Sequence, residues 1–448
     1  MNLPERRRVM KTIQNPWAWV PTLYFAEGIP YVMVNTISVI MFKKMGMSNG
    51  DVAMFTGLLY LPWVIKPLWS PFVDIIRTKR WWTVSMQLLM TVAMACGAFF
   101  LPSLPESSIA AGNVPVSPFT ATLVMFWITA FASATHDIAA DGFYMLALSQ
   151  DRQSFFVGIK STFYRLATIF GQGVLVFIAG VLEGKTGDVP FSWTLTLALA
   201  SLIFGAMALY HTFILPRPAS DCPHLASSRT VRAKEILKES GRTFSTFFTK
   251  RHIWLGIAFM LLFRLPEAFL VKMLNPFLLD SVEAGGLGLP TEQVGIAYGT
   301  VGVAALTAGG ILGGMAASRW GLRKVMWPMA LSLALPCSVF LYLGIAQPAS
   351  LWVISSCVAL DQFGYGFGFT AYMLYMIMFS EGEFKTSHYS LCTAFMALSM
   401  MIPGMFAGYL QEWLGYVGFF WMVMVCCMAT VAVTASVKST VRWAESEK

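Results

Sequence analysis

Residues 314–324 read Gly314-Met-Ala-Ala-Ser318-Arg319-Trp-Gly321-Leu-Arg323-Lys324 and follow a long apolar run. A stretch in the same register, Ser70-Pro-Phe-Val-Asp74-Ile-Ile-Arg77-Thr-Lys79-Arg80, follows an earlier apolar run, although its acid is replaced by Ser318 in the later copy. A short basic turn lets cations meet helix C-terminal carbonyls and lock one conformation. The repetition predicts two similar halves, each with a gating loop: Asp74, Arg77, Lys79 and Arg80 in the first, Arg319, Arg323 and Lys324 in the second.

Long apolar segments recur along the whole chain outside these turns. Hydrophobic residues make up 56% and charged residues 12% of the sequence, whereas soluble domains carry about 25% charged residues. A segment of about 20 apolar residues crosses the hydrocarbon core with its backbone bonded inside one helix. We therefore expect about twelve membrane-spanning helices, at Trp17–Met41, Val52–Ile76, Trp82–Leu101, Phe119–Leu148, Phe156–Leu182, Trp193–Leu215, Ile253–Leu279, Val294–Ala317, Val325–Ala346, Leu351–Phe379, Tyr389–Leu410 and Tyr416–Val437.

Basic residues gather in alternate loops between these segments. Besides the two repeated turns, one side of the membrane carries a basic segment at 216–252 and Arg6, Arg7, Arg8, Lys11, Arg152, Lys385, Lys438 and Arg442. The other side has little beyond Lys43, Lys44 and Lys185. The positive-inside rule places the richer side, with both termini, in the cytoplasm. The net charge of +8 therefore reports topology rather than a nucleic-acid partner.

The chain divides at its largest break in hydrophobicity. We expect an N-terminal six-helix bundle at 1–215, a cytoplasmic linker at 216–252 and a C-terminal six-helix bundle at 253–448. Residues 230–241 have the charge spacing of a surface helix or of a solvated linker. The first helix shows no cleavage pattern, so we expect it to be retained. Six of the seven cysteines fall in apolar segments and read as packing residues, with no disulfide framework.

Motifs in the first half resemble those of a known family. The second span ends Lys66-Pro67-Leu-Trp69-Ser70-Pro71-Phe-Val-Asp74, the fourth carries Ser133-Ala-Thr-His136-Asp137-Ile138-Ala-Ala-Asp141-Gly142, and the fifth carries Phe163-Tyr164-Arg165-Leu166. With the repeated turns, they resemble the major facilitator superfamily and, within it, the AmpG-type muropeptide permeases. His136 and Gly142 depart from the family, which usually has Gln and Ala there, and the second half shows only the general transporter pattern.

The resemblance implies an all-α membrane protein with the twelve-helix major facilitator fold, built from two six-helix bundles. It also implies a multi-pass protein of the cell inner membrane that imports a peptidoglycan-derived amino sugar or anhydro-muropeptide together with protons. The exact sugar is not fixed by these motifs.

Ionisable residues inside the expected spans indicate where the function lies. They are Glu27, Lys66, His136, Asp137, Asp141, Arg165, Arg264, Glu267, Lys272 and Asp361. Each charge costs about 2.5–3.5 kcal/mol at membrane depth unless it is paired or hydrated. A water-filled cavity between two helical halves, as in secondary transporters, would meet that need.

Asp137 and Asp141 are four residues apart and therefore share one helix face. Two neighbouring acids in a low dielectric repel, so that one of them is suited to bind and release a proton. We expect Arg165 to be their counter-ion. The alternative is a static ion-paired strut between the fourth and fifth spans.

The first and seventh spans carry a similar pattern of acid and proline. Glu27 stands between Phe25 and Pro30, where a loosened backbone favours a binding site, or else it pairs with Lys66. In the seventh span Arg264 and Glu267 have the spacing of an ion pair, and Lys272 is expected to snorkel outward.

The tenth span joins polar residues to alternating glycines and aromatic residues at Asp361-Gln362-Phe-Gly364-Tyr365-Gly366-Phe-Gly368-Phe369. Aromatic faces suit a sugar ring, whereas the glycines alone are equally explained by close helix packing. The proton-coupling candidates are thus Asp137, Asp141, Glu27, Glu267 and Asp361. The substrate-binding candidates are Glu27, Tyr31, Lys66, His136, Arg165, Arg264, Gln362 and Tyr365.

Other chemistry finds no support in the sequence. It lacks a Walker-type phosphate loop and an HExxH motif, so we expect neither an enzyme nor a bound cofactor or metal. The expected partners are a small solute, protons and the bilayer, for a monomer without nucleic acid. One alternative is transport of another organic anion, such as an acyl-coenzyme A or a drug-like solute. The other is a membrane receptor or scaffold that transports nothing.

Overall fold

The computed structural model describes residues 15–218, 221, 241–242, 244–382 and 385–446 of the chain. All regular secondary structure in this part is helical, which confirms the predicted all-α class. Several expectations lie outside what is described: the basic residues 6–11, Cys222, the surface helix at 230–240 and the side chains of Asp74 and Arg442.

The first part of the chain forms helices at the first six expected spans. They are α2 (Val20–Val32) continued by η2 (Met33–Ile37) and α3 (Ser38–Lys44), α4 (Asn49–Leu58) with α5 (Leu61–Ile76), α6 (Lys79–Phe99), α8 (Thr120–Ala147), α9 (Gln150–Ile169) continued by η4 (Phe170–Leu175) and α10 (Val176–Thr186), and α11 (Val189–Ile214).

The second part forms helices at the other expected spans. They are α13 (Ile253–Leu262) with α14 (Leu265–Leu279), α15 (Thr291–Val294) continued by η7 (Gly295–Gly302) and α16 (Val303–Trp320), α17 (Leu322–Ala334) with η8 (Leu335–Cys337) and α18 (Ser338–Ala346), α19 (Leu351–Phe379), and α20 (Lys385–Ser446). Within α20, Gly415 has φ 66° and ψ 170° and divides it into two helices.

Within the described residues, ten helical stretches are long and apolar enough to cross a membrane, and one of them, Ser387–Lys438, contains the break at Gly415. Local sequence fixes where several begin. Ser48, Thr78 and Asp188 each accept a backbone N–H three residues onward, at 2.9–3.1 Å. These side chains satisfy orphan donors at the starts of α4, α6 and α11. The six described cysteines are free, as predicted.

Several spans are irregular near their middle. The π-helical turns η2, η4 and η7 interrupt the first, fifth and eighth spans, and η2 begins three residues after Pro30. The seventh span breaks between α13 and α14 at Arg264, whose φ of −104° and ψ of 13° leave the helical region. Such irregular turns are frequent at functional sites, and the loosened backbone expected around Glu27 is consistent with them.

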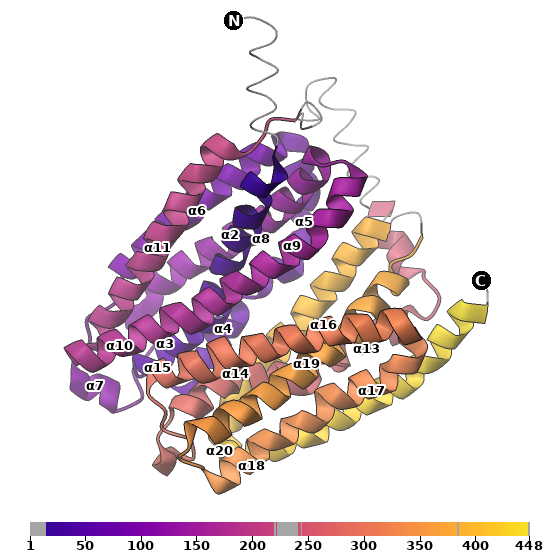
Figure 1. The fold of residues 1–448 in the computed structure, drawn as a ribbon. Coiled ribbons are helices and arrows are strands. Elements are labelled where there is room, and N and C mark those ends of the chain that lie inside the picture. The colour runs from indigo at the N-terminus through magenta and orange to yellow at the C-terminus, as the bar shows by residue number, and fades with distance from the viewer. Residues whose placement is uncertain (1–14, 219–220, 222–240, 243, 383–384, 447–448) are drawn as a thin grey trace, which may run out of the picture.

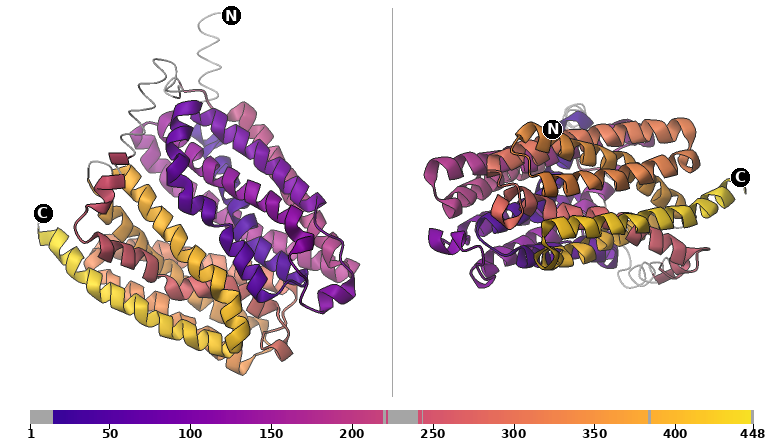
Figure 2. Two further views of the ribbon diagram at one scale, coloured as in Figure 1. Left: turned by 180° about the vertical axis from the view of Figure 1, so that it is seen from behind. Right: turned by 90° about the horizontal axis from the view of Figure 1, so that it is seen from below.

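The helices of the first part of the chain (α2–α11) form one group and those of the second part (α13–α20) form another. Two close helix crossings join these two groups. A Cβ atom on Gly299 of η7 would lie 2.1 Å from the Gln172 carbonyl oxygen of η4. A Cβ atom on Gly408 of α20 would lie 1.9 Å from the Asn49 carbonyl oxygen of α4. Only glycine permits these approaches. In Figures 1 and 2 the two groups converge at the end where α10 meets α15 and lie apart at the opposite end. We call the first the closed end; it carries residues 43–51, 183–188, 280–292 and 409–416.

The first predicted gating turn is anchored to the segment that follows α11. The backbone N–H groups of Lys79 and Arg80 donate to the two carboxylate oxygens of Asp221, at 2.6 and 2.9 Å. The Arg80 guanidinium donates to the carbonyl oxygens of Thr212 and Leu215 at 2.5 and 3.1 Å. The other described cations of the two turns include Arg77 over Trp81 and Arg319 over Trp320, while Lys324 is exposed.

Candidate functional site

Asp137 and Asp141 lie on one face of α8 but have different partners. Asp137 accepts a hydrogen bond from the Trp63 indole N–H of α5, at 2.9 Å. Asp141 accepts from the Tyr24 hydroxyl at 3.1 Å and forms an ion pair with Lys160 of α9. The Lys160 ammonium also lies 4.3 Å from the centroid of the Tyr24 ring. The acids thus tie α8 to three neighbouring helices.

The predicted counter-ion was wrong: the cation paired with Asp141 is Lys160, not Arg165. Five residues of helix separate the two cations by roughly 7.5 Å along the axis and turn them to different faces. Arg165 instead faces the second group of helices, where a Cβ atom on Gly310 would lie 2.9 Å from its guanidinium nitrogen. Arg165 has no ion pair within the described residues.

Glu27 approaches the acids of α8 from α2. Its side chain is buried, and its Oε2 atom has no hydrogen-bond partner within the described part of the chain. Carboxylate oxygens of Glu27 and Asp137 and a ring nitrogen of His136 all lie within 4.8 Å of one another. Lys66 attracts Glu27 and Asp137 electrostatically, but no ion pair within 4.0 Å joins Lys66 to Glu27 among these residues. The alternative Glu27–Lys66 pair is therefore not formed.

His136 belongs to a buried polar network that sequence reasoning did not foresee. Its Nε2 atom lies 3.0 Å from Gln87 Nε2 of α6, and Gln87 Oε1 lies 3.0 Å from His211 Nδ1 of α11. The network ends at Thr22 of α2, whose hydroxyl lies 2.9 Å from His211 Nε2. Both Gln87 and His211 fall inside expected spans, so their polarity at membrane depth was the available signal.

Aromatic side chains line the region between the acids just described (Glu27, Asp137 and Asp141) and the second group of helices. The ring of Tyr31 lies 6.3 Å from Tyr60, 5.3 Å from Trp63 and 6.4 Å from Tyr164, measured between centroids. Tyr60 belongs to one hydrophobic cluster with Ala268 of α14 and Met400 of α20, and Tyr31 packs against this cluster. A planar, partly polar surface of this kind can take the apolar face of a sugar ring.

Arg264 anchors the site from the second group of helices. It donates to the Tyr365 hydroxyl, and its guanidinium carbon lies 4.7 Å from the centroid of Phe369. Glu267 is buried, and neither of its carboxylate oxygens has a hydrogen-bond partner in the described chain. The expected Arg264–Glu267 ion pair was wrong, because the helix breaks at Arg264 and aromatic faces hold the guanidinium instead.

The expectation that Lys272 reaches outward was also wrong. Its side chain is 2% exposed, and its ammonium donates to the Thr56 hydroxyl of α4 at 3.0 Å. It also lies 5.2 Å from the centroid of the Tyr60 ring. Because α4 packs over this face of α14 at the junction of the two groups of helices, Lys272 is enclosed there.

In the tenth span, α19, the glycines and the polar side chains have different surroundings. Cβ atoms on Gly364, Gly366 and Gly368 would lie 2.1–2.5 Å from carbonyl oxygens of α16 and α17, so these glycines serve close helix packing. Tyr365 lies at Arg264, and the Gln362 amide donates to Asp361 at 3.0 Å. Each of these polar side chains therefore already has a hydrogen-bond partner within the protein.

Polar contacts at the closed end bridge the two groups of helices. Lys43 forms an ion pair of 2.6 Å with Asp280. Asp280 also accepts from the Tyr416 hydroxyl at 2.6 Å and from the Asn49 amide at 3.1 Å. The Asn49 amide reaches Gln411 at 2.7 Å as well. None of these contacts was predicted, because side chains near the ends of helices show no sequence pattern that reveals a partner far along the chain.

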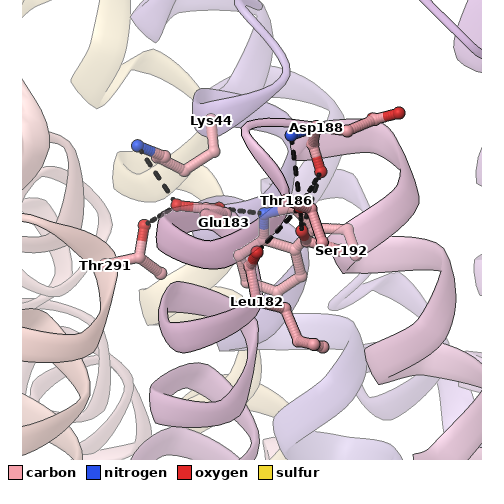
Figure 3. Close-up of polar contacts among 8 residues, drawn as sticks. Lys44, Leu182, Glu183, Thr186, Asp188, Ser192 and Thr291 are labelled. Atoms are coloured by element: carbon pink, nitrogen blue, oxygen red, sulfur yellow. Dashed lines mark hydrogen bonds and ion pairs between the residues drawn. The ribbon is translucent and has the colours of Figure 1, made fainter.

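A second bridge at the closed end centres on Glu183 of α10. Figure 3 shows its carboxylate meeting Lys44 and Thr291. Thr291 donates to it at 2.6 Å from α15, and the Trp193 indole N–H donates at 2.7 Å from α11. One carboxylate thereby links both groups of helices at this end.

Comparison with known proteins relates this geometry to transporters. A sequence profile described as the BT1 family matches residues 26–268. The anhydromuropeptide permease of Escherichia coli (strain K12) is 23% identical over 410 residues, which cover 89% of this chain and 74% of that permease. The putative transporter AmpG 4 of Rickettsia conorii is 22% identical over 432 residues, covering 91% of this chain and 92% of that protein.

Solved structures show a similar fold. The nucleoside transporter NupG aligns with a TM-score of 0.66 at 14% identity, covering 94% of this chain and 98% of its own. A POT family transporter aligns with a TM-score of 0.69 at 11% identity, covering 93% and 94%. At these identities the likeness concerns the fold alone, and it confirms the expected major facilitator fold.

Proposed function

This chain belongs to the BT1 family, and on that premise we propose that it is a proton-coupled secondary transporter that imports a peptidoglycan-derived amino sugar or anhydro-muropeptide into the cytoplasm. It is an AmpG-like permease of the major facilitator superfamily, a multi-pass inner-membrane transporter rather than an enzyme. The solute, the coupling ion and the direction are what the proposal adds.

The observation that carries the proposal is the cluster of Glu27, Asp137 and His136, whose ligand-type atoms lie within 4.8 Å of one another. Within it, Oε2 of Glu27 and Nδ1 of His136 are buried without a hydrogen-bond partner in the described part of the chain. Two carboxylates held so close in a low dielectric favour shared protonation. The same cluster adjoins Trp63 and the aromatic group around Tyr31. Proton exchange and solute contact would therefore occur in one place.

The choice of solute rests on the relatives and on the chemistry around Tyr31. The similar Escherichia coli protein is named an anhydromuropeptide permease. Aromatic rings suit pyranose faces, the carboxylates suit an amino or hydroxyl group, and the cations Arg165 and Arg264 suit a carboxylate of the peptide part. The candidates Lys66, Gln362 and Tyr365 would add further polar contacts from both groups of helices.

The cycle is proposed to be alternating access between two six-helix bundles, 1–215 and 253–448, joined by the linker 216–252. The closed end would face the periplasm, because the basic loops lie at the other end and place both termini in the cytoplasm. The arrangement would thus be an inward-facing state of a monomer, with the turns at Asp74 and Ser318 near its cytoplasmic gate.

Transport by purified protein in liposomes tests the proposal. Wild-type protein should concentrate labelled anhydro-muropeptide under an inward proton gradient and lose this when the gradient is collapsed. Asp137→Asn should abolish concentrative uptake, while solute exchange across equal concentrations continues. Asp188→Asn is a matched control, because Asp188 only caps α11 at the closed end.

Concentrative uptake that is unchanged in Asp137→Asn would remove that acid from coupling. If the wild type moves no peptidoglycan fragment under any gradient, the proposed solute is wrong.

A second candidate solute is another organic anion, such as an acyl-coenzyme A. It is favoured by Arg165, which has no ion pair in the described chain, and by Arg264, which is held by aromatic rings rather than by a carboxylate. Competition against labelled anhydro-muropeptide would separate the two. Displacement by the acyl-coenzyme A but not by amino sugars would favour this alternative.

A further inference from the structure

Four side chains from four helices form one continuous hydrogen-bonded run that ends next to the carboxylates of Glu27 and Asp137. Thr22 of α2, His211 of α11, Gln87 of α6 and His136 of α8 follow one another at 2.9, 3.0 and 3.0 Å. Gln87 and both histidines are 0% exposed. A buried polar run of this length is destabilising unless its members have hydrogen-bond partners.

One atom at the end of the run has no partner. His136 uses Nε2 for Gln87, and its Nδ1 atom is buried without a hydrogen bond in the described part of the chain. The carboxylate oxygen Oε2 of Glu27 is likewise buried and without a partner. A ring nitrogen of His136 lies within 4.8 Å of oxygens of both Glu27 and Asp137, and Nδ1 is the ring nitrogen that has no hydrogen bond within the run.

The orientation of the Gln87 amide decides what His136 can offer. With the amide nitrogen toward His136, Nε2 is an acceptor, and the proton of a neutral imidazole resides on Nδ1. His211 then donates from Nδ1 to Gln87 Oε1 and accepts the Thr22 hydroxyl at Nε2. In this arrangement His136 presents an N–H donor, which suits a charged carboxylate.

Rotating the amide by half a turn exchanges its oxygen and nitrogen without changing its shape. His136 then donates from Nε2 to Gln87, and its Nδ1 becomes an acceptor, which suits a protonated carboxyl group. His211 accepts from Gln87 at Nδ1 and donates from Nε2 to Thr22. Thr22 in turn donates to the Trp19 carbonyl oxygen at 3.2 Å. All three hydrogen bonds within the run can therefore form in both arrangements.

We propose that Gln87, His211 and Thr22 are positioning residues that set the tautomer of His136, so that His136 supports the Glu27–Asp137 pair both when it is charged and when it holds a proton. The inference rests on the proposed proton coupling and deepens it. Gln87 is the member that makes both arrangements possible, because an amide alone offers a donor and an acceptor of equal shape. The coupling carboxylates therefore depend on a residue that touches neither of them.

The test compares driven uptake with exchange in liposomes for Gln87→Met, which keeps the side-chain length and removes both polar atoms. Loss of the two hydrogen bonds that Gln87 makes to His136 and His211 should lower proton-driven uptake about 10-fold or more. Counterflow exchange, which requires no net proton movement, should stay within about twofold of wild type. A residue that only holds the fold would lower both rates together.

Ser201→Ala is the matched control. Ser201 of α11 donates to the Thr91 carbonyl oxygen of α6 at 2.9 Å, so it removes a hydrogen bond between the same two helices without touching the run. His136→Gln supplies a second check. Since glutamine has no tautomer to set, Gln87→Met should reduce proton-driven uptake much less in the His136→Gln background than in the wild type. The fold reductions of the two single variants should therefore not multiply in the double variant.

Gln87→Met that behaves as Ser201→Ala, or that lowers driven uptake and exchange equally, overturns the inference while the proposed function stands. Equal, multiplying losses in the double variant also overturn it. A wild-type protein that exchanges solute without any response to a proton gradient overturns both proposals.

Discussion

Neutralising Asp280 should open the closed end. Its carboxylate meets the Lys43 ammonium at 2.6 Å and accepts from Tyr416 and Asn49. The side chains of Asp280 and Lys43 are 15% and 16% exposed, so the pair is poorly screened. Asp280→Asn keeps the shape and an acceptor oxygen but leaves Lys43 unpaired.

The expected magnitude follows from the bond that is lost. A hydrogen bond to a charged group contributes about 1.5–3 kcal/mol, and we take about 2 kcal/mol because the pair keeps some contact with solvent. Since about 1.4 kcal/mol corresponds to a factor of ten, the balance should shift roughly 30-fold toward the state in which this end is open. A minor population would then become readily measurable.

Distances between spin labels at positions 185 and 283 provide the assay. Lys185 and Glu283 are exposed and lie at the closed end in the first and second groups of helices. Asp280→Asn should add a population at longer distance, whereas Asp188→Asn, an acid at the same end that caps its own helix, should not. Identical distance distributions in all three proteins would refute the role given to this ion pair.

Two further predictions concern the acid cluster and the helix crossings. Lys160→Met should reduce uptake about 10-fold or more, because Asp141 loses its ion pair; Lys160→Arg should restore part of it, and equal rates in both variants would contradict the assignment. Gly299→Ala should cost about 1–3 kcal/mol and lower the Tm in detergent, because its Cβ atom would lie 2.1 Å from a carbonyl oxygen. Gly184→Ala meets nothing within 4 Å, and a matching loss of Tm there would contradict the packing explanation.

The helical architecture was accessible from the sequence because the bilayer imposes it. Every backbone group of a span must bond within its own helix, so the length and apolar character of each segment predict a helix without knowledge of its neighbours. The repeated turn at Arg77 and Arg319 then indicated two related groups of helices. Irregular turns were less accessible: Pro30 gave a signal for η2, whereas the π turns at 170–175 and 295–302 arise where glycines of two spans cross.

The ion-pair partners of the charged side chains in the site were much harder to predict from the sequence. Spacing along one helix correctly placed Asp137 and Asp141 on one face, but it could not decide between Lys160 and Arg165 as counter-ion. That choice depends on the rotation of α9 against α8, which packing sets. The pairing of Arg264 with Glu267 failed because the spacing rule assumes a continuous helix, and the chain breaks at Arg264.

The closed end is held by glycine-mediated helix crossings and by polar bridges, and both kinds of contact keep the free energy of opening this end small. The crossings at Gly299 and Gly408 bring backbones together with almost no side chain between them, so little specific packing is lost when they part. The polar bridges at Asp280 and Glu183 use groups that water can satisfy once the end opens. Burying large interlocking side chains there would instead make each opening costly. A transporter that must leave this state in every cycle is better served by close but smooth backbone contact and a few exchangeable hydrogen bonds.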